Sequence, residues 1–462
     1  MTDDTIAAVA TPPGIAAVAI IRISGPHATA IEQACFVPAR AVRVRRPATL
    51  VRGWIIDPAT GERLDDALAA YFVAPHSYTG EDLVELHVHG GGGVVASCLA
   101  LVLRLGAVLA PPGEFTRRAF FNGRIDLAQA EAVADLIAAE SERAAKAAAY
   151  RLAGALGARV RELRREALDR LVEIEAHVDY PEEVAPPDDS QLRIMLEQQR
   201  MEVDELLRGA GAAHVLRDGI ECTIAGPPNA GKSSLLNALT RAERAIVSEI
   251  AGTTRDIVED RVAIDGVVLR LRDTAGLRTT HDPIEAEGVN RALAAIAQAQ
   301  LVIAVIDVSR ELGLDERDAL AQTAGSRSIV FGNKLDLGNR GLDSVRSIVD
   351  AGAGDGARSI VVAGSVRWPE TIEELRRIIA DIGWGGQLDG SRALVAGARQ
   401  IEALTRAQSA IGHAGSTLGA SLPIDLVAAD LRDAIAAYGE VTGDTVTEEV
   451  LDGIFSRFCV GK

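Results

Sequence analysis

The chain has 462 residues, of which 48% are hydrophobic and 24% charged, a composition that predicts a soluble globular protein of two or three domains. Its formal net charge of −17 at pH 7 excludes a general nucleic-acid binder, although a local basic patch or a partner protein can still bring it to RNA. The start of the chain lacks the basic segment of a signal peptide, the apolar runs are too short to span a membrane, and the four cysteines form no C-x-x-C pair, so we expect a cytoplasmic enzyme with reduced thiols, no membrane contact and no disulfide framework.

The first 121 residues predict a small α/β domain. Residues 6–10 and 16–23 are short apolar runs that favour strands. Residues 83–88 predict a further strand, and apolar positions with a helical period follow over residues 94–105. The polar stretch 77–82 before that strand is, by composition alone, a turn.

Two segments, 122–216 and 383–462, are predicted to be helical. The stretch 127–156 is rich in Ala, Glu, Leu and Arg and contains no proline, which favours one long helix. Helical periodicity continues over 159–177 and resumes over 191–207 after a break that contains proline. The carboxylates of these helices are expected to be solvated rather than catalytic.

Residues 226–233, with the sequence GPPNAGKS, match the phosphate-binding pattern G-x-x-x-x-G-K-[ST]. The context is the expected one, because residues 223–225 end an apolar strand and residues 234–239 open an amphipathic helix. Glycines let the backbone approach a polyphosphate, Lys232 is placed to reach the outer phosphates, and the Ser233 hydroxyl is placed to bind Mg²⁺. The segment therefore predicts a nucleoside triphosphate site.

Further short motifs identify the nucleotide as GTP. Residues 333–336 (NKLD) follow an apolar run and match the guanine-reading pattern N-K-x-D, whose carboxylate accepts two N–H groups that adenine lacks. Residues 273–276 (DTAG) follow a strand, which is the expected place for the turn that senses the metal ion and the γ-phosphate. Residues 253–254 are two threonines between the phosphate-binding loop and this turn, where a switch threonine contacts Mg²⁺ in the GTP state. Each motif is weak alone, but their order predicts a GTPase.

The segment 217–382 alternates strand and helix patterns, which predicts a mostly parallel sheet covered on both faces. The expected strands are 261–264 and 267–271, joined by an Asp-Gly turn, together with 301–308 and 359–362, and the expected helices are 285–298 and 371–379. The predicted fold class is multidomain, α/β plus all-α, with a Ras-like P-loop GTPase inserted into a helical bundle after an N-terminal α/β domain. The predicted domains are 1–121, 122–216, 217–382 and 383–462.

Sequence stretches along nearly the whole chain match one family. They are residues 10–14 (ATPPG), 20–26 (IIRISGP), 77–82 (SYTGED), 112–118 (PGEFTRR), 126–135 (DLAQAEAVAD), 226–239, 250–256 (IAGTTRD), 273–278 (DTAGLR) and 458–462 (FCVGK). The chain thereby resembles the MnmE (TrmE) tRNA-modification GTPases. The N-terminal and C-terminal stretches are specific to this family, whereas the GTPase motifs alone also fit ribosome-assembly relatives.

The resemblance implies a homodimer formed through folate-binding N-terminal domains. It implies a flavin-dependent partner of the MnmG (GidA) type, which is an FAD protein that joins the dimer in a heterotetramer or larger complex. The implied substrates of this complex are certain tRNAs. The expected product carries an aminomethyl or carboxymethylaminomethyl group at C5 of the wobble uridine. Methylene-tetrahydrofolate, with 5-formyl-tetrahydrofolate as its analogue, is the expected one-carbon donor, and glycine or ammonium the nitrogen donor. GTP hydrolysis is expected to need Mg²⁺ and K⁺.

The resemblance also assigns roles in the GTP site. Leu277 stands where many GTPases have a water-orienting glutamine and cannot hydrogen-bond to water, so that role falls to Glu285, although the start of a helix explains this residue equally well. With Lys232, Glu285 is an expected catalytic residue. The expected metal ligands are Ser233 and Thr254 for Mg²⁺, and Asn229, Ser248, Ile250 and Thr253 for K⁺. The residues expected to contact GTP are Asn229, Ala230, Gly231, Lys232, Ser233, Ser234, Ser248, Glu249, Ile250, Ala251, Gly252, Thr253, Thr254, Asp273, Thr274, Ala275, Gly276, Asn333, Lys334, Asp336, Ser365 and Val366.

The folate ligands implied by the resemblance are Arg22, Glu81, Arg124 and Lys462. A carboxylate suits the donors of a pterin edge, and cations suit a glutamyl tail. Arg124 replaces a lysine that family members often carry, which keeps the charge but changes its geometry. Residues 15–17 (IAA) depart from the family pattern. Cys459 is a further expected catalytic residue, and a small packed residue is the alternative interpretation of its apolar surroundings.

Two other classes of function fit part of the sequence. A ribosome-assembly GTPase switch would share the nucleotide motifs, but no RNA-binding module is evident after the GTPase segment. A structural scaffold with an inactive nucleotide site is disfavoured by the intact Lys232, Ser233 and Asp273.

Overall fold

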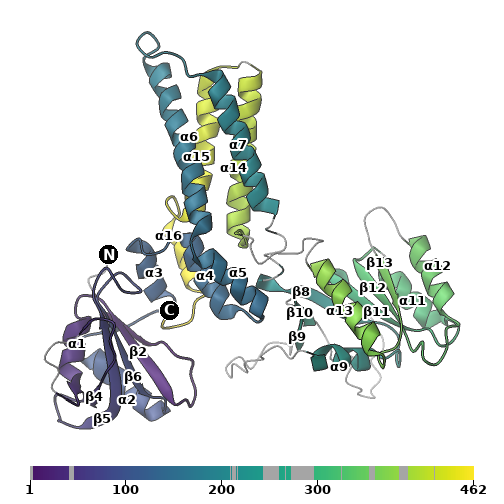
Figure 1. Cartoon of the computed structure of the whole chain (residues 1–462), viewed down its shortest axis with the longest axis horizontal. Coiled ribbons are helices and arrows are strands. Elements are labelled where there is room, and N and C mark those ends of the chain that lie inside the picture. The colour runs from purple at the N-terminus through teal and green to yellow at the C-terminus, as the bar shows by residue number, and fades with distance from the viewer. Residues whose placement is uncertain are drawn as a thin grey trace. The chain divides into compact units, whose positions relative to one another are not determined.

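The chain forms two compact units in a computed structural model (Figure 1). The model describes residues 4–40, 46–208, 210, 215, 217–242, 260–265, 267–271, 296–323, 325–352, 359–383, 394–420 and 422–462. The first unit comprises Met1–Ala134, Arg151–Val203 and Glu402–Lys462, and the second comprises Asp135–Tyr150 and Asp204–Ile401. The division into four domains stays a prediction.

The N-terminal part of the first unit is a seven-stranded sheet with the order β3-β4-β5-β6-β2-β1-β7. Its strands are β1 (Ile6–Val9), β2 (Val18–Ser24), β3 (Phe36–Pro38), β4 (Val51–Ile56), β5 (Arg63–Phe72), β6 (Leu83–His89) and β7 (Val108–Leu109). Neighbouring strands are antiparallel except β1 and β7, which are parallel. The strands expected near residues 6–10, 16–23 and 83–88 are confirmed, whereas β3, β4 and β5 were not predicted.

Helices cover one face of this sheet. Side chains from α1 (Ala28–Cys35) and α2 (Gly92–Arg104) share a buried apolar core with inward residues of β2 and β6 such as Ile21 and Leu86. Because side chains alternate across a strand, Arg22 and Glu85 lie on the opposite face, where they are paired across β2 and β6. Arg22, one of the predicted folate ligands, therefore lies on the face away from α1 and α2.

The predicted long helix over residues 127–156 is wrong, because the chain breaks twice there. It forms α4 (Leu127–Ala138), α5 (Glu142–Leu152) and the start of α6 (Ala155–Asp179). Ser141 Oγ accepts the N–H of Ala144 at 3.1 Å, which caps a new helix start. Gly154 has φ of 85°, a left-handed conformation that ends α5 before α6 begins.

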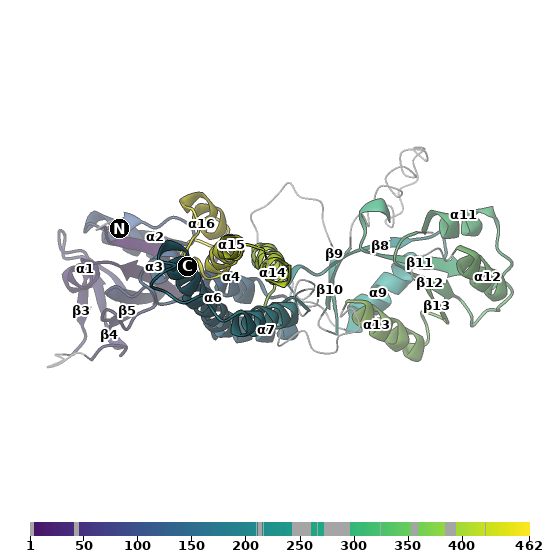
Figure 2. The same ribbon diagram turned by 90° about the horizontal axis from the view of Figure 1, so that it is seen from above.

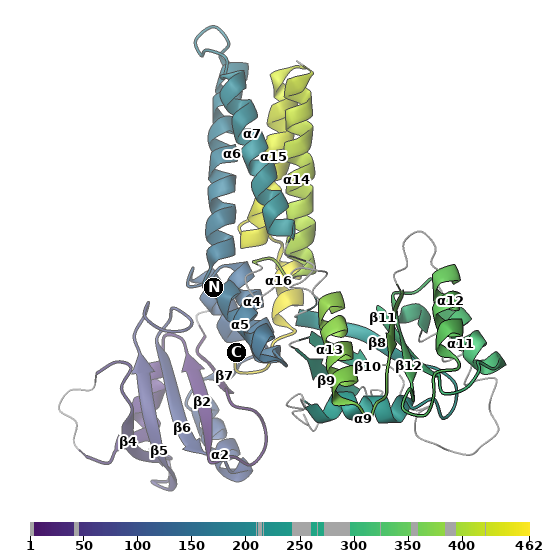
Figure 3. The ribbon, with the colours of Figure 1, turned by 45° about the vertical axis from the view of Figure 1, so that its right-hand side comes forward.

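Long helices pack side by side in the rest of the first unit (Figure 3). They are α6, α7 (Asp189–Arg208), α14 (Ala398–Gly419) and α15 (Ile424–Thr442), with the short α3 (Glu114–Phe121) and α16 (Glu448–Phe455) near one end. Tyr438 of α15 is fully buried, and its hydroxyl donates to Gln199 Oε1 at 3.2 Å. Gln199 Nε2 in turn donates to the carbonyl of Leu163 at 2.8 Å, so three helices share one buried polar chain.

The second unit contains a six-stranded sheet with the order β13-β12-β11-β8-β10-β9 (Figure 2). Its strands are β8 (Ile220–Ala225), β9 (Asp260–Ile264), β10 (Val267–Leu271), β11 (Leu301–Asp307), β12 (Ser328–Asn333) and β13 (Ser359–Ala363), and all pairs except β9 with β10 are parallel. The helices are α9 (Lys232–Ala242), α11 (Leu314–Thr323), α12 (Leu342–Gly352) and α13 (Pro369–Gly383). Side chains of α9 and α13 share one core with the sheet, and those of α11 and α12 share another. The predicted mostly parallel sheet with two covered faces is confirmed.

Within the described part of the chain, no helix has both the length and the apolar character needed to cross a membrane.

Replacing Tyr438 with phenylalanine removes the hydroxyl group that donates a hydrogen bond to Gln199 Oε1 inside the bundle. We expect Tyr438→Phe to lower the stability of the first unit by about 1–2 kcal/mol, because a buried acceptor loses its partner. Thermal unfolding of the full chain measures this change. Tyr180→Phe is the matched control, since Tyr180 is 60% exposed. Equal melting temperatures for both variants would contradict the prediction.

Candidate functional site

The loop between β8 and α9 is shaped by glycines that no other residue can replace without strain. Gly226 and Gly231 have φ of +137° and +106°, and Asn229 adopts a left-handed φ of 62°. A Cβ atom at Gly226 would lie 2.2 Å from the carbonyl oxygen of Val305. A Cβ atom at Gly231 would lie 2.3 Å from Asn333 Nδ2. The loop therefore curls tightly against the sheet, as a backbone cradle for phosphates requires.

Lys232 holds its ammonium group against this loop. Its Nζ donates to the carbonyl oxygens of Gly226 and Pro227 at 2.7 and 2.8 Å. Burial lowers the pKa of Lys232. Ser233 and Ser234 follow it in the first turn of α9, and the start of a helix attracts anions through its dipole. The loop, the ammonium group and the helix start together form an anion-binding site.

The side chain of Asn333 joins the loop to a second expected contact segment. Asn333 Nδ2 donates to the carbonyl of Ala230 at 2.8 Å, and Asn333 Oδ1 accepts the N–H of Val366 at 3.1 Å. Asn333 and Ser365 are both buried at 1% exposure. The structure thus brings Ala230, Asn333 and Val366, predicted from three separate motifs, into direct contact.

Lys334 and Asp336 have partners that the motifs did not predict. Lys334, with a left-handed φ of 66°, donates from Nζ to Asp307 Oδ2 at 2.7 Å. Burial alone would raise the pKa of Asp307, but bonds from Lys334 and Ser309 outweigh it and hold that pKa lower than usual. Asp336 Oδ2 lies 3.5 Å from Arg367 Nη1. Asp307 was missed, although a signal existed: like Asn333, it ends a buried apolar strand, and β11 and β12 pair these two residues.

Other predicted residues of the GTP site lie outside the described part of the chain. They are Ser248, Glu249, Ile250, Ala251, Gly252, Thr253, Thr254, Asp273, Thr274, Ala275, Gly276 and Glu285. Their roles stay predictions, and so does that of the helix expected over 285–298, of which only the last residues are described.

A second group of predicted residues meets in the first unit. Arg22 of β2 donates from Nη2 to Glu85 Oε1 of β6 at 2.8 Å and from Nη1 to the carbonyl of Gly461 at 3.3 Å. Lys462 is half-buried, and burial followed by the nearby Arg22 charge lowers the pKa of Lys462. Gly461 has φ of +92°, and a Cβ there would lie 2.4 Å from the carbonyl oxygen of Val9. This close approach places the last residues beside β1 and brings Lys462 to Arg22.

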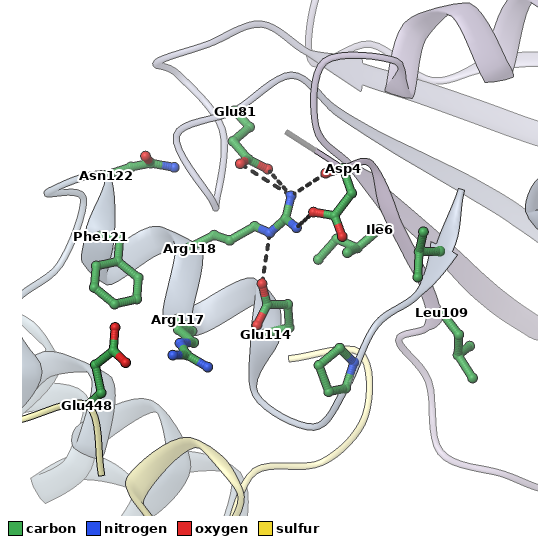
Figure 4. Close-up of a pocket in the computed structure, with 12 residues that line it drawn as sticks. Asp4, Ile6, Glu81, Leu109, Glu114, Arg117, Arg118, Phe121, Asn122 and Glu448 are labelled. Carbon is green, nitrogen blue, oxygen red and sulfur yellow. Dashed lines mark hydrogen bonds and ion pairs between the residues drawn. The ribbon is translucent and has the colours of Figure 1, made fainter. Parts of the chain in front are cut away.

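Glu81 lies in a different network, around Arg118 (Figure 4). The buried Arg118 guanidinium donates to the Glu81 carboxylate at 3.1 Å, and also to Asp4 and Glu114. Glu81 Oε2 further accepts the Ser24 hydroxyl at 2.7 Å. These groups line part of a cavity of about 500 Å³. The carboxylate beside Arg22 is Glu85, which sequence reasoning missed because its place opposite Arg22 depends on the register of two strands that are far apart in the chain.

Arg124 contacts the loop that carries Glu81, and Cys459 contacts the start of α3. Arg124 Nε donates to the carbonyl of Ser77 at 3.1 Å, and the carbonyl of Cys459 accepts the N–H of Gly113 at 3.4 Å. Cys459 is exposed, unlike the other three cysteines. Burial raises the pKa of Cys35 and Cys222 to about 12 and that of Cys98 to about 11, so those thiols are poor nucleophiles.

Metal binding by side-chain clusters has no support in the residues that are described: no three His, Cys, Asp or Glu residues among them are grouped to hold an ion. The Mg²⁺ and K⁺ sites expected from the motifs would instead combine hydroxyl, amide and backbone oxygens with phosphate oxygens. Ser233 and Asn229 lie at the phosphate-binding loop, where their oxygen atoms suit hard cations.

Comparison with known proteins decides the family. The model of the TrmE N-terminus, described as that of a GTP-binding protein, matches residues 5–124, and the MnmE helical domain model matches residues 127–459. The chain belongs to the MnmE family of tRNA modification GTPases. A tRNA modification GTPase MnmE from Moorella thermoacetica is 44% identical over 466 residues, covering 100% of both chains. The MnmE of Symbiobacterium thermophilum is 43% identical over 467 residues, again covering 100% of both. The relatives thus match this MnmE-family chain through both units.

The glycine at position 231 gives a direct test of the phosphate-binding loop. We expect Gly231→Ala to weaken GTP binding by at least about tenfold, because its Cβ would displace the Asn333 side chain that holds Ala230. Equilibrium titration with a fluorescent GTP analogue measures the change. Gly325→Ala is the matched control, since Gly325 has a positive φ of +86° in the same unit but open space around it. If both variants lost a similar amount of affinity for the GTP analogue, backbone strain alone would explain the effect and the role of Asn333 would be contradicted.

Proposed function

We propose that the protein is a potassium-dependent GTPase that modifies the wobble uridine of certain tRNAs together with an FAD-containing partner of the MnmG (GidA) type. The observation that carries the proposal is a sequence identity of 43–44% to curated tRNA modification GTPases over the full length of the chain. The contacts among the phosphate-binding loop, Asn333 and Val366 support the GTPase half of it. The product proposed is an aminomethyl or carboxymethylaminomethyl group at C5. Among the residues that the structure describes, no contact favours the alternative of a ribosome-assembly switch.

In the GTP site, each described residue has a physical task. The loop N–H groups and the start of α9 hold the phosphates, and Lys232 exchanges its bonds to Gly226 and Pro227 for bonds to phosphate oxygens. Asp336 accepts the N–H groups of guanine. Ser233 with Thr254 would hold Mg²⁺, and Asn229 with Ser248, Ile250 and Thr253 would hold K⁺. Bound there, the two cations supply positive charge against the phosphates, and Glu285 orients water.

In the first unit, the arrangement fits a reduced folate. Arg22, Lys462 and Arg124 offer cations for an anionic tail, and Glu85 offers a carboxylate for the donors of a pterin edge. Methylene-tetrahydrofolate, when bound, supplies the one-carbon unit. Both glutamates are engaged: Glu85 Oε1 accepts two bonds from Arg22, and both Glu81 oxygens accept bonds from Arg118. Glu85 Oε2, however, lies 3.6 Å from His87 Nε2, beyond hydrogen-bond distance, so we propose Glu85 in place of the predicted Glu81 as the carboxylate that contacts the ligand. The exposed Cys459 is proposed to act near this site.

The proposed assembly is a homodimer in the cytoplasm that joins its partner in a heterotetramer or larger complex. The net charge of −17 makes direct, unaided tRNA binding unfavourable, so a partner that contributes basic surface suits this chain.

Nucleoside analysis of tRNA tests the proposed activity. With the partner and GTP present, we expect wobble-uridine modification in K⁺ and its loss in Na⁺. GTP hydrolysis in Na⁺ should fall by roughly ten- to a thousandfold, because K⁺ stands where an arginine finger supplies ~10³–10⁵ in other GTPases. Lys232→Ala should abolish both activities in either ion. Equal hydrolysis in the two ions would refute potassium dependence, and unmodified tRNA in K⁺ would refute the proposed chemistry.

The two glutamates of the first unit should respond differently to substitution. We expect Glu85→Gln to weaken binding of 5-formyl-tetrahydrofolate by about tenfold or more with little change in melting temperature, because a charge-assisted bond to the ligand is lost. Glu81→Gln should instead lower the melting temperature, because buried Arg118 loses a partner, and should change ligand affinity by less than about threefold. The opposite pattern would restore Glu81 as the ligand residue.

A further inference from the structure

The ring of Tyr78 lies within reach of two cations. The guanidinium carbon of Arg22 is 5.2 Å from the centroid of this ring, and the ammonium nitrogen of Lys462 is 6.0 Å from it. Both distances fall within the range in which a cation is attracted to an aromatic face. One tyrosine therefore contacts two basic residues that come from opposite ends of the sequence.

The two cations need such a partner because they repel one another away from bulk water. The Arg22 side chain is only 13% exposed, and Lys462 is half-buried. Glu85 offsets part of the repulsion through its ion pair with Arg22 at 2.8 Å. The negative face of an aromatic ring adds a further favourable contact for each cation. The Tyr78 ring thus lowers the free energy of keeping both charges in one place.

The orientation of this ring is set by α3. The hydroxyl of Tyr78 lies 2.8 Å from Thr116 Oγ1, and Thr116 is fully buried. Phe115, on the same helix, packs against Tyr78 and lies with its ring 5.7 Å from Arg22. Swinging the whole side chain away from the cations about its Cα–Cβ bond would break the bond to Thr116.

The backbone on both sides of Tyr78 is also held from outside the loop. Asn122 Nδ2 donates to the carbonyl of Thr79 at 2.7 Å, and Arg124 Nε donates to the carbonyl of Ser77 at 3.1 Å. The segment 77–82, which composition identifies only as a turn, is therefore a fixed support for one aromatic ring.

We propose that Tyr78 is the positioning residue of the reduced-folate site. Its ring holds Arg22 and Lys462 together as one receptor for a carboxylate of the ligand, and Thr116 fixes the ring. This inference rests on the proposed folate site and deepens it, because none of the residues assigned to that site is aromatic.

The test is a binding titration of the full chain with 5-formyl-tetrahydrofolate. We expect Tyr78→Leu to raise the Kd by about 5- to 30-fold, because both ring–cation contacts are lost. Tyr78→Phe keeps the ring but loses the bond to Thr116, so it should raise the Kd by only about two- to fivefold, as Thr116→Val should. In a Lys462→Gln background, the effect of Tyr78→Leu should shrink to about fivefold or less, because one of the two cations is already gone. This dependence on Lys462 is what a merely structural tyrosine would lack.

Controls separate the possible failures. Tyr180→Leu, which removes a tyrosine that is 60% exposed, should leave the Kd unchanged. Circular dichroism and the melting temperature show whether Tyr78→Leu is folded; if it is not, Thr116→Val, which frees the ring, should raise the Kd by about two- to fivefold. An unchanged Kd in the folded variant tested, or equal weakening with and without Lys462, overturns the role of Tyr78. Absence of binding by the wild type overturns the folate site itself.

Discussion

The amide side chain of Asn333 is the interaction on which the nucleotide site depends. It bonds to the carbonyl of Ala230 in the phosphate-binding loop and to the N–H of Val366 in the segment expected to support guanine. An amide supplies a donor and an acceptor from one rigid plane, so it fixes two backbone segments relative to each other. Gly231 permits this contact, since any side chain there would occupy the place of Asn333 Nδ2. A single buried residue thus joins the phosphate-binding loop to the segment that is expected to support guanine.

In the first unit, two cationic side chains lie close together although the chain as a whole is strongly acidic. Arg22 and Lys462 share Glu85 and the Tyr78 ring as sources of negative potential. Arg118 of α3 shows the inverse arrangement, because one buried guanidinium donates to Asp4, Glu81 and Glu114. The segment 77–82 contributes to both networks, through Tyr78 in one and Glu81 in the other.

Both sites use residues that strands place at the edge or on the open face of a sheet. In the second unit, Asp307 and Asn333 end neighbouring parallel strands, so their side chains reach the same edge as the phosphate-binding loop. In the first unit, Arg22 and Glu85 lie opposite one another on antiparallel strands, on the face that α1 and α2 leave free. The family relationship extends across both units.

The sequence by itself determined the P-loop GTPase fold, its insertion between helical segments and the family, because these depend on local patterns: glycine spacing, apolar strand runs and short motifs. It also identified Asn333 and Lys232 by type and spacing. Only the tertiary structure decided which carboxylate faces Arg22, because the pairing of Glu85 with Arg22 depends on the register of β2 and β6, which no local pattern records. The breaks around Ser141 and Gly154 were likewise missed, since helix propensity summed over residues 127–156 outweighs a single cap and a single left-handed glycine. Long-range contacts, such as Gly461 against Val9, depend on how distant segments pack, and no local pattern carries that information.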